Sequence, residues 1–422
     1  MQGPGFAFYF FPMDKQELIV IGGGAAGYFC AVNAARLNPN LRVRILEKSG
    51  KVLSKVRISG GGRCNVTHSC FDITEMVRKY PRGGNFVKKA FHNFFTTDTI
   101  NWFGERGVKL KTEPDGRMFP VTDSSQTIID CLTREANLYG VELHLMSDVR
   151  RISKSAGLFE IECADGKKFT ATQVCVASGG YPKTSMFDWL VSLGHSINEP
   201  VPSLFTLNIP DNPITGLMGV SVEEARIRVN GMKLEQQGPL LITHWGFSGP
   251  GVLRLSAWGA RLLAAAGWNC TIQVNWLPAI SEPELREKFA SLRYTVAASK
   301  VSGKNQFGMP ARLWEFLVTA AGIRENTRWA DLPAKEANKL IRNLNAGEFQ
   351  VRGKTTYKEE FVTAGGIKPE EIDPSTMMSK KMDGLYFAGE VIDVDGITGG
   401  FNFQHAWTSG FISAKAAALR PV

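Results

Sequence analysis

A glycine-rich turn near the start of the chain constrains the fold more than any other feature. A short β-branched run predicts a buried strand, and the pattern GxGxxG follows it at Gly22, Gly24 and Gly27. Helical spacing then runs over residues 25–37, and a second predicted strand ends at Glu47. Strand, glycine turn, helix, strand and acidic residue form the fingerprint of a dinucleotide-binding unit.

Each residue of this turn has a physical role. Gly22 permits the tight turn, Gly24 lets the backbone approach a pyrophosphate, and Gly27 allows close packing of helix on strand. The helix N-terminus, with Ala25 and Ala26 in its first turn, stabilises the negative charge of the phosphates.

The residues after the second strand are assigned to the same nucleotide. The Glu47 carboxylate can accept hydrogen bonds from both hydroxyls of the adenosine ribose, and it would repel a 2′-phosphate. Lys48 follows it directly. The fingerprint alone fits either FAD or NAD.

A first later segment favours FAD. Residues 148–180 contain alternating predicted strands and then an apolar strand that ends in Ala177, Ser178 and Gly179. Such a meander returning to a small-residue turn is the layout of FAD domains of the glutathione-reductase type. In these domains the backbone at the start of the meander, here Val149, meets the adenine.

A second segment, near the C-terminus, strengthens this choice. A short predicted strand precedes a glycine turn, several acidic residues, a second glycine pair and a helix from about residue 402. A carboxylate just past a strand end can bind ribitol hydroxyls, and the helix N-terminus favours the negative charge of a reduced flavin. An NAD-only enzyme does not need this element, so the sequence predicts non-covalent FAD. The residues assigned to FAD here are Gly389, Glu390, Asp393, Asp395, Gly399, Gly400, Phe401 and Asn402.

Four segments together resemble a known family. KVRISGGGRCNVTH, LITHWGFSGPGVLRLS, FVTAGGI and TMMSKKMDGLYFAGEVIDVDGITGGFNFQHAWTSGF are similar to the BaiN-like, aminoacetone-oxidase-type family of FAD-dependent oxidoreductases. The resemblance covers about residues 17–415. It implies a second loop in contact with FAD, made of Gly60, Gly61, Gly62, Arg63, Cys64 and Asn65.

Within that loop, Arg63 would either bind the anionic part of the cofactor or position the loop. Cys64 is assigned to packing beside the cofactor rather than to redox catalysis. Disulfide chemistry needs a partner at short, fixed spacing, and Cys70 is six residues away.

Three further residues are candidates for a substrate pocket. His244 and Trp245 fall within a family motif, and they either line the pocket or anchor the structure locally. His405 stands where the family often has an apolar or aromatic residue, so it either faces the flavin cavity or simply belongs to the helix. After Gly179 the chain also lacks the family's Gly-Ser-Thr-Gly-like turn, so contacts around residues 181–187 are not carried over.

The expected fold class is α/β, an FAD-binding Rossmann-like domain with an inserted β-barrel and helical subdomain. The expected boundaries are an N-terminal extension (1–16), the first part of the FAD domain (17–199), the insert (200–352) and the C-terminal part of the FAD domain (353–422). The helical subdomain is expected at about 278–346. Since ligand sites favour domain junctions, the insert would shape the substrate pocket.

Composition narrows the function classes. The 422 residues carry a net charge of +9, but Lys and Arg are spread along the chain, which disfavours nucleic acid as a partner. The seven cysteines form no CxxC pair, and an odd number favours a reducing cytoplasm. The apolar run within residues 1–12 is too short to span a bilayer, and no metal-ligand spacing occurs.

These observations predict a flavoprotein that passes a hydride through flavin N5, with NAD(P)H-dependent reduction of a small organic molecule. No second GxGxxG follows a strand, so a nicotinamide would dock transiently. One alternative is a small-amine oxidase that uses O2. Another, motivated by the positive charge, is a non-enzymatic flavin-containing protein that binds RNA or another partner. The sequence assigns neither catalytic residues nor an oligomeric state.

Overall fold

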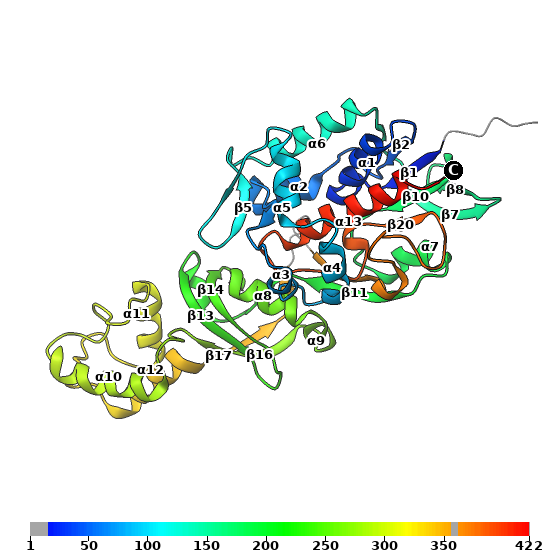
Figure 1. The fold of residues 1–422 in the computed structure, drawn as a ribbon. Coiled ribbons are helices and arrows are strands. Elements are labelled where there is room, and N and C mark those ends of the chain that lie inside the picture. The colour runs from blue at the N-terminus through cyan, green and yellow to red at the C-terminus, as the bar shows by residue number, and fades with distance from the viewer. Residues whose placement is uncertain (1–15, 356–361, 422) are drawn as a thin grey trace, which may run out of the picture. The chain divides into compact units, whose positions relative to one another are not determined.

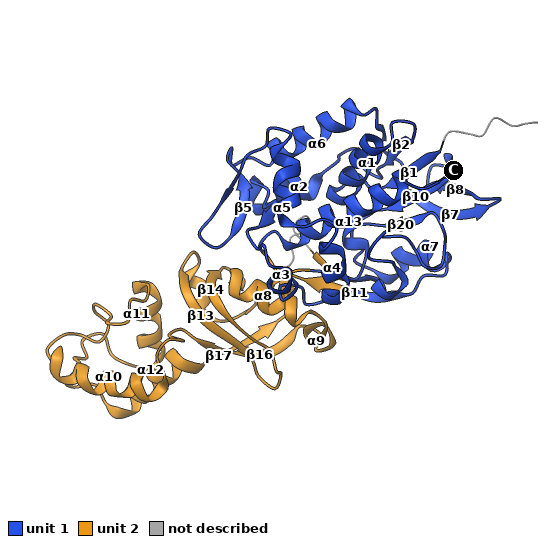
Figure 2. Cartoon of the chain, in the orientation of Figure 1, with its two compact units in different colours: residues 1–200, 365–395, 399–422 blue, residues 201–364, 396–398 orange. Residues whose placement is uncertain are grey.

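The chain divides into two compact units. The computed structural model describes residues 16–355 and 362–421, so almost all of the expected N-terminal extension lies outside it. One unit contains residues 1–200, 365–395 and 399–422, and the other contains residues 201–364 and 396–398 (Figure 2). We call them unit 1 and unit 2.

Unit 1 is built on a five-stranded parallel sheet with the order β20-β10-β1-β2-β6. Its central strand β1 is almost wholly buried, because apolar residues occupy both faces. The strands are β1 (Glu17–Ile21), β2 (Arg42–Leu46), β6 (Glu142–His144), β10 (Gln173–Val176) and β20 (Leu385–Phe387).

Two helices from opposite ends of the chain pack together in unit 1. Helix α1 (Ala25–Leu37) and helix α13 (Phe401–Ala418) lie side by side (Figure 1). A Cβ on Gly27 would overlap the carbonyl oxygen of Gly22, and one on Gly410 would lie 2.7 Å from the carbonyl oxygen of Ala26. Helix α1 is therefore held against backbone on two sides.

Smaller elements complete unit 1. Two three-stranded sheets have the orders β3-β5-β4 and β7-β8-β9. The elements are α2 (Ser54–Gly62), β3 (Thr67–His68), α3 (Ile73–Val77), α4 (Gly84–Phe91), α5 (Thr96–Gly104), β4 (Leu110–Thr112), β5 (Arg117–Pro120), α6 (Gln126–Leu138), β7 (Val149–Ser155), β8 (Leu158–Cys163), β9 (Lys168–Ala171) and α7 (Asp188–Val191).

Unit 2 contains a seven-stranded antiparallel sheet with the order β17-β16-β13-β14-β15-β12-β18. Its two outer strands are consecutive, since Gly353 alone separates β17 from β18. The Gly353 carbonyl accepts from the Asn208 N–H, and its own N–H donates to the Trp268 carbonyl. One bent segment thus pairs with both edges and closes the sheet into a barrel.

The barrel strands are β12 (Thr206–Asn208), β13 (Ser221–Val229), β14 (Glu235–Thr243), β15 (Gly246–Ser248), β16 (Asn269–Asn275), β17 (Gly347–Arg352) and β18 (Lys354–Thr355). The helices of unit 2 are α8 (Pro250–Trp258), α9 (Ala260–Ala265), α10 (Glu282–Thr295), α11 (Ala311–Ala320) and α12 (Ala334–Ala346). Strands β11 (Ile197–Ser203) and β19 (Val362–Ile367) carry the chain from one unit to the other and back.

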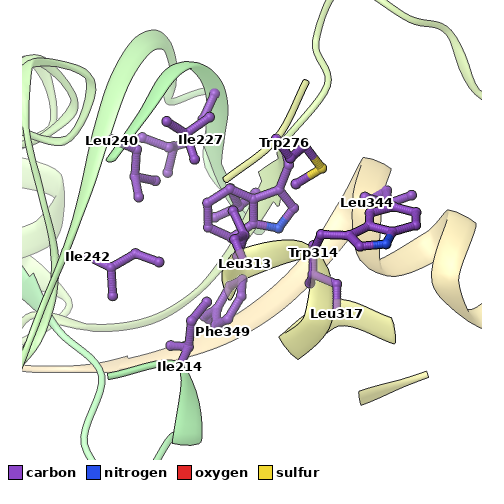
Figure 3. Packing of buried hydrophobic residues seen from close by; sticks show 14 of the residues in the cluster. Ile214, Ile227, Leu240, Ile242, Trp276, Leu313, Trp314, Leu317, Leu344 and Phe349 are labelled. Carbon is purple, nitrogen blue, oxygen red and sulfur yellow. The ribbon is translucent and has the colours of Figure 1, made fainter. Parts of the chain in front are cut away.

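Helices α10, α11 and α12 share a core with the barrel rather than forming a separate one. Trp276 and Phe349 from the barrel side and Trp314 and Leu344 from the helices belong to a single buried cluster (Figure 3). The helical subdomain is therefore an insertion between β16 and β17 of the barrel.

The fold class agrees with the sequence-based prediction, whereas the unit boundary lies later than the residue 352 that we expected. Residues 353–355 belong to unit 2, because Lys354 and Thr355 pair with Leu207 and Thr206 in the barrel. Residues 356–361, within the expected C-terminal part of the FAD domain, lie outside the described residues.

The close contact of α1 with α13 predicts a large effect from one methyl group. Gly410→Ala should destabilise the protein by about 1–3 kcal/mol, because the added carbon meets helix backbone that cannot move alone. The control is Gly104→Ala at the end of α5, where nothing described lies within 4 Å, and which should be neutral or stabilising by up to about 1 kcal/mol. Chemical unfolding of the apoproteins measures both, and equal stabilities would contradict this account.

Candidate flavin site

The carboxyl ends of four parallel strands place most of the predicted cofactor residues at one edge of the sheet. Ligands bind at this edge in open parallel sheets. The segments that follow β1, β2, β10 and β20 contain Gly22 and Gly24, Glu47 and Lys48, Ala177, Ser178 and Gly179, and Gly389 and Glu390 respectively.

Gly24 shows that the first turn has room for a ligand. Gly22 and Gly27 are explained by the protein itself, since a Cβ on either would overlap neighbouring backbone. Gly24 has an ordinary extended backbone, and a Cβ there would find nothing described within 4 Å. Packing and strain therefore do not explain this glycine, and its assignment to a pyrophosphate beside the uncapped N-terminus of α1 stays a prediction.

The Glu47 carboxylate lies against the same turn. Its Oε2 accepts from the Gly23 N–H at 2.8 Å, and its Oε1 accepts from both the N–H and the hydroxyl of Ser49. The backbone N–H of Ser147 donates to the Glu47 carbonyl, which brings the start of β7, at Val149, beside this corner. Nearby, the Lys48 ammonium lies 5.7 Å from the Tyr181 ring centroid.

The glycines that end α2 (Ser54–Gly62) are not α-helical, because the chain kinks at Ser59. Gly60, Gly61 and Gly62 all have φ between +59° and +84°, the left-handed region that glycine adopts without strain. Arg63 pairs with Glu113 at 2.6 Å and lies over the Phe119 ring at 4.0 Å. Of the two roles predicted for Arg63, these contacts support positioning of the loop.

Cys64 is fully buried, and burial raises the pKa of its thiol to about 12. The thiol is therefore neutral near pH 7, and a neutral thiol is a poor nucleophile. This environment supports the packing role proposed for Cys64 over a redox role.

The same loop contacts the N-terminus of α13. With its amide oriented to satisfy both groups, Asn65 accepts from the Gly400 N–H at 2.9 Å and donates to the Thr67 carbonyl. His68 stacks on Phe401, with ring centroids 4.7 Å apart, and its Nδ1 lies 3.0 Å from the Gly399 carbonyl oxygen. Two predicted cofactor segments, far apart in sequence, thus meet directly.

The first turn of α13 contains no acidic residue, and among the described residues Asn65 is the side chain that accepts from the N–H of its N-cap residue, Gly400. Phe401 is buried in this turn, and Asn402 follows it. The N-terminal N–H groups consequently keep their positive electrostatic potential.

Helix α13 also holds the turn after β20. The hydroxyl of Ser409 accepts from the Gly389 N–H at 2.9 Å, while Nε2 of His405 lies 3.3 Å from the Gly389 carbonyl oxygen. A carbonyl can only accept, so the His405 proton sits on Nε2. Beside them, Glu390 forms an ion pair with Lys55 at 2.6 Å.

His405 is a buried, uncharged histidine. Burial lowers the pKa of its imidazole from 6.5 to about 4. Its Nδ1 has no hydrogen-bond partner among the described residues. Of the two positions considered for His405, the structure shows a side chain directed at the Gly389 turn.

Asp393 and Asp395 have protein partners. Asp393 accepts from the Asn198 side-chain amide at 2.6 Å. Asp395 is fully buried and forms a two-pronged ion pair with Arg82. Their assignment to cofactor hydroxyls remains a prediction, and these contacts give Asp395 in particular a structural role.

The two residues predicted for a substrate pocket in the insert lie at the turn between β14 and β15. His244 is exposed and packs edge-on against Trp245 at 4.4 Å between ring centroids. The Trp245 indole donates to the Thr206 hydroxyl at 3.0 Å. Their role in a pocket stays a prediction.

Sequence reasoning missed four residues that support the site: Lys55, His68, Arg82 and Asn198. A signal existed for Arg82, because it precedes the pair Gly83–Gly84. A Cβ on Gly83 would lie too close to Val394, so the glycine marks a close approach of two chain segments.

A parallel Rossmann sheet with glycine turns at its carboxyl edge and a helix N-terminus beside them defines a flavin-binding oxidoreductase. Residues 16–416 match the family described as HI0933-like protein Rossmann domain, and the chain belongs to that family. This confirms the family resemblance and the FAD-type Rossmann fold predicted from the sequence, and the cofactor is a flavin.

Relatives cover nearly the whole chain. A 3-dehydro-bile acid delta(4,6)-reductase from Clostridium scindens is 29% identical over 414 residues, which cover 95% of this chain and 99% of the relative. A ribosomal RNA dihydrouridine synthase from Escherichia coli is 30% identical over 421 residues, 96% of this chain and 98% of the relative.

A solved structure shares the fold. The 3-ketosteroid-delta4-(5alpha)-dehydrogenase of Rhodococcus jostii superposes with a TM-score of 0.51 at 14% identity, covering 96% of this chain and 97% of that one. In residues 16–355 and 362–421, no helix is long and apolar enough to cross a membrane, and no group of three or more His, Cys, Asp and Glu side chains is placed to bind a metal.

The open space at Gly24 yields a matched pair of variants. Gly24→Val should lower FAD affinity at least about tenfold while costing the apoprotein less than about 1 kcal/mol, since extended backbone accommodates valine. Gly27→Ala should instead destabilise the fold itself. Flavin titration and unfolding of both apoproteins separate the two effects, and full affinity in Gly24→Val would remove the pyrophosphate from this turn.

The buried His405 predicts acid sensitivity. Between about pH 6.5 and pH 4 the unfolded imidazole binds a proton that the folded one does not, so stability falls as the pH falls. Across this range His405 contributes a loss of about 1.4 kcal/mol per pH unit. His405→Gln should therefore lose less stability than the parent between about pH 7 and pH 5 in apoprotein unfolding. If the parent and His405→Gln lost the same stability over this pH range, the His405 imidazole would not be a buried, neutral group.

Proposed function

We propose that the protein uses bound FAD to reduce a carbon–carbon double bond conjugated to a carbonyl, with NAD(P)H as the electron donor. The observation that carries the cofactor assignment is the unexplained open space at Gly24 beside the uncapped N-terminus of α1. FAD supplies hydride transfer through flavin N5 when it is bound.

The residues fit such a cofactor in an extended arrangement. The first turn of α1 would hold the pyrophosphate, and Glu47 the adenosine ribose. The turn at Gly389 and the loop at residues 60–65 would enclose the remainder, together with the N-terminus of α13. Its N–H groups would stabilise negative charge at the flavin N1–C2=O edge.

Two buried side chains of this arrangement are neutral. The Cys64 thiol and the His405 imidazole are both uncharged near pH 7 because they are buried. His405 acts through Gly389, since its Nε2–H points at that carbonyl. We therefore assign His405 to positioning of the turn and not to proton transfer.

The names of the relatives support the reaction class. A delta(4,6)-reductase and a dihydrouridine synthase share one chemistry, because both names describe saturation of a double bond conjugated to a carbonyl. We propose the same class of acceptor here. The seven cysteines are free thiols, which supports the cytoplasm as the compartment.

Anaerobic reduction tests the proposal. NADH or NADPH added to the FAD-loaded protein should bleach the visible flavin band. A 3-oxo-4-ene steroid or a uridine-containing oligonucleotide should then restore it, whereas a saturated analogue should not. A flavin that neither nucleotide reduces would overturn the reductase. Oxygen consumption with small amines would then indicate an oxidase.

A further inference from the structure

The helical subdomain of unit 2 brings together basic residues that are far apart in the sequence. One loop, between α10 and α11, carries Lys300 and Lys304, and another, between α11 and α12, carries Arg324 and Arg328 (Figure 1). All four side chains are exposed, and none forms an ion pair with a described residue. We call these four residues the basic patch.

Backbone pairing holds the two loops side by side. Lys300 and Arg328 face each other in an antiparallel bridge. The N–H of Val301 donates to the Thr327 carbonyl at 2.9 Å, and the Ser302 hydroxyl donates to the Glu325 carbonyl at 2.9 Å. The clustering is therefore a property of the fold.

The pair Lys300–Arg328 is unfavourable for the isolated protein. Like charges directly opposite each other on paired segments repel, and here no carboxylate among the described residues pairs with either. The two loops, residues 296–310 and 321–333, carry the acidic residues Glu325 and Asp331 against four basic ones. A polyanion would relieve this repulsion.

An exposed aromatic ring lies at the helix end that leads into the first loop. Tyr294, in the last turn of α10, is 84% exposed. Ser299 follows Tyr294 by five residues, and its carbonyl accepts from the Trp329 N–H. This hydrogen bond extends the pairing of the two loops beside Lys300 and Arg328. In proteins that bind single-stranded nucleic acid, basic side chains contact the phosphates and exposed aromatic rings stack on the bases. The basic patch and Tyr294 offer both kinds of group.

We infer that the basic patch, with Tyr294, is a binding surface for the backbone of single-stranded RNA. The inference rests on the proposed function. An RNA that binds this surface would supply a uracil ring, whose double bond is conjugated to a carbonyl, as the group to be reduced. The naming of one relative as a ribosomal RNA dihydrouridine synthase favours RNA over other polyanions.

The test compares two triple variants of the FAD-loaded full chain. The patch variant is Lys300→Gln, Lys304→Gln and Arg328→Gln. The control is Lys335→Gln, Lys339→Gln and Arg342→Gln on α12, which removes the same charge from exposed positions of the same subdomain. Binding of a fluorescein-labelled single-stranded RNA is measured by anisotropy over a salt series.

The patch variant should bind at least about tenfold more weakly, and the slope of log K against log salt should fall by about 2, since each lost phosphate contact on a single strand contributes about 0.7. The control variant should bind as the parent does. Equal weakening in both variants, or no RNA binding by the parent, would overturn the inference. Inorganic phosphate, added at a concentration equal to that of the RNA phosphate groups, should not displace the RNA. Displacement would also overturn the inference, because the surface would then bind single phosphates and not an RNA backbone.

Reduction of the flavin by NAD(P)H should be unchanged in both variants, because neither alters a residue of unit 1. If the patch binds RNA but NAD(P)H does not reduce the flavin, the RNA-binding surface is supported and the proposed reductase activity is contradicted. The two proposals can therefore fail separately.

Discussion

The structure of unit 1 depends on how closely helix α1 approaches its neighbours. At Gly27 the helix touches the backbone of the first turn, and at Gly410 it touches α13. These contacts leave no room for side chains, so the sheet edge, the turn and α13 are held in a fixed arrangement. The N-termini of both helices belong to unit 1, and each contributes positive electrostatic potential to the proposed flavin site.

The fold was predictable where the signals are local. The turn at Gly22, Gly24 and Gly27 combines strand, glycine spacing and helix within some twenty residues, and the structure reproduces it. The ion pairs Lys55–Glu390 and Arg82–Asp395 were not predictable, because their partners are 335 and 313 residues apart. A charged residue carries no local information about a partner so far away in the sequence, so only the fold reveals these pairs.

The spacing of charged residues along the sequence also fails to predict where charges cluster in the fold. Basic residues spread evenly along the sequence disfavoured a nucleic-acid partner, yet two loops of the helical subdomain bring Lys300 and Arg328 opposite each other. A pattern read along the chain measures sequence separation, whereas electrostatic repulsion depends on distance in space. The same holds for the flavin site, where Asn65 and Gly400 meet although the sequence separates them widely.

The position of the helical subdomain has a consequence for how the barrel forms. Strands β16 and β17 pair directly, with Val274 opposite Gly347, yet α10, α11 and α12 lie between them in the chain. Bringing these strands together from a disordered chain would require closure of a long loop, at a large entropic cost. We expect the three helices to collapse first and shorten the effective connection, which makes barrel closure a late kinetic event.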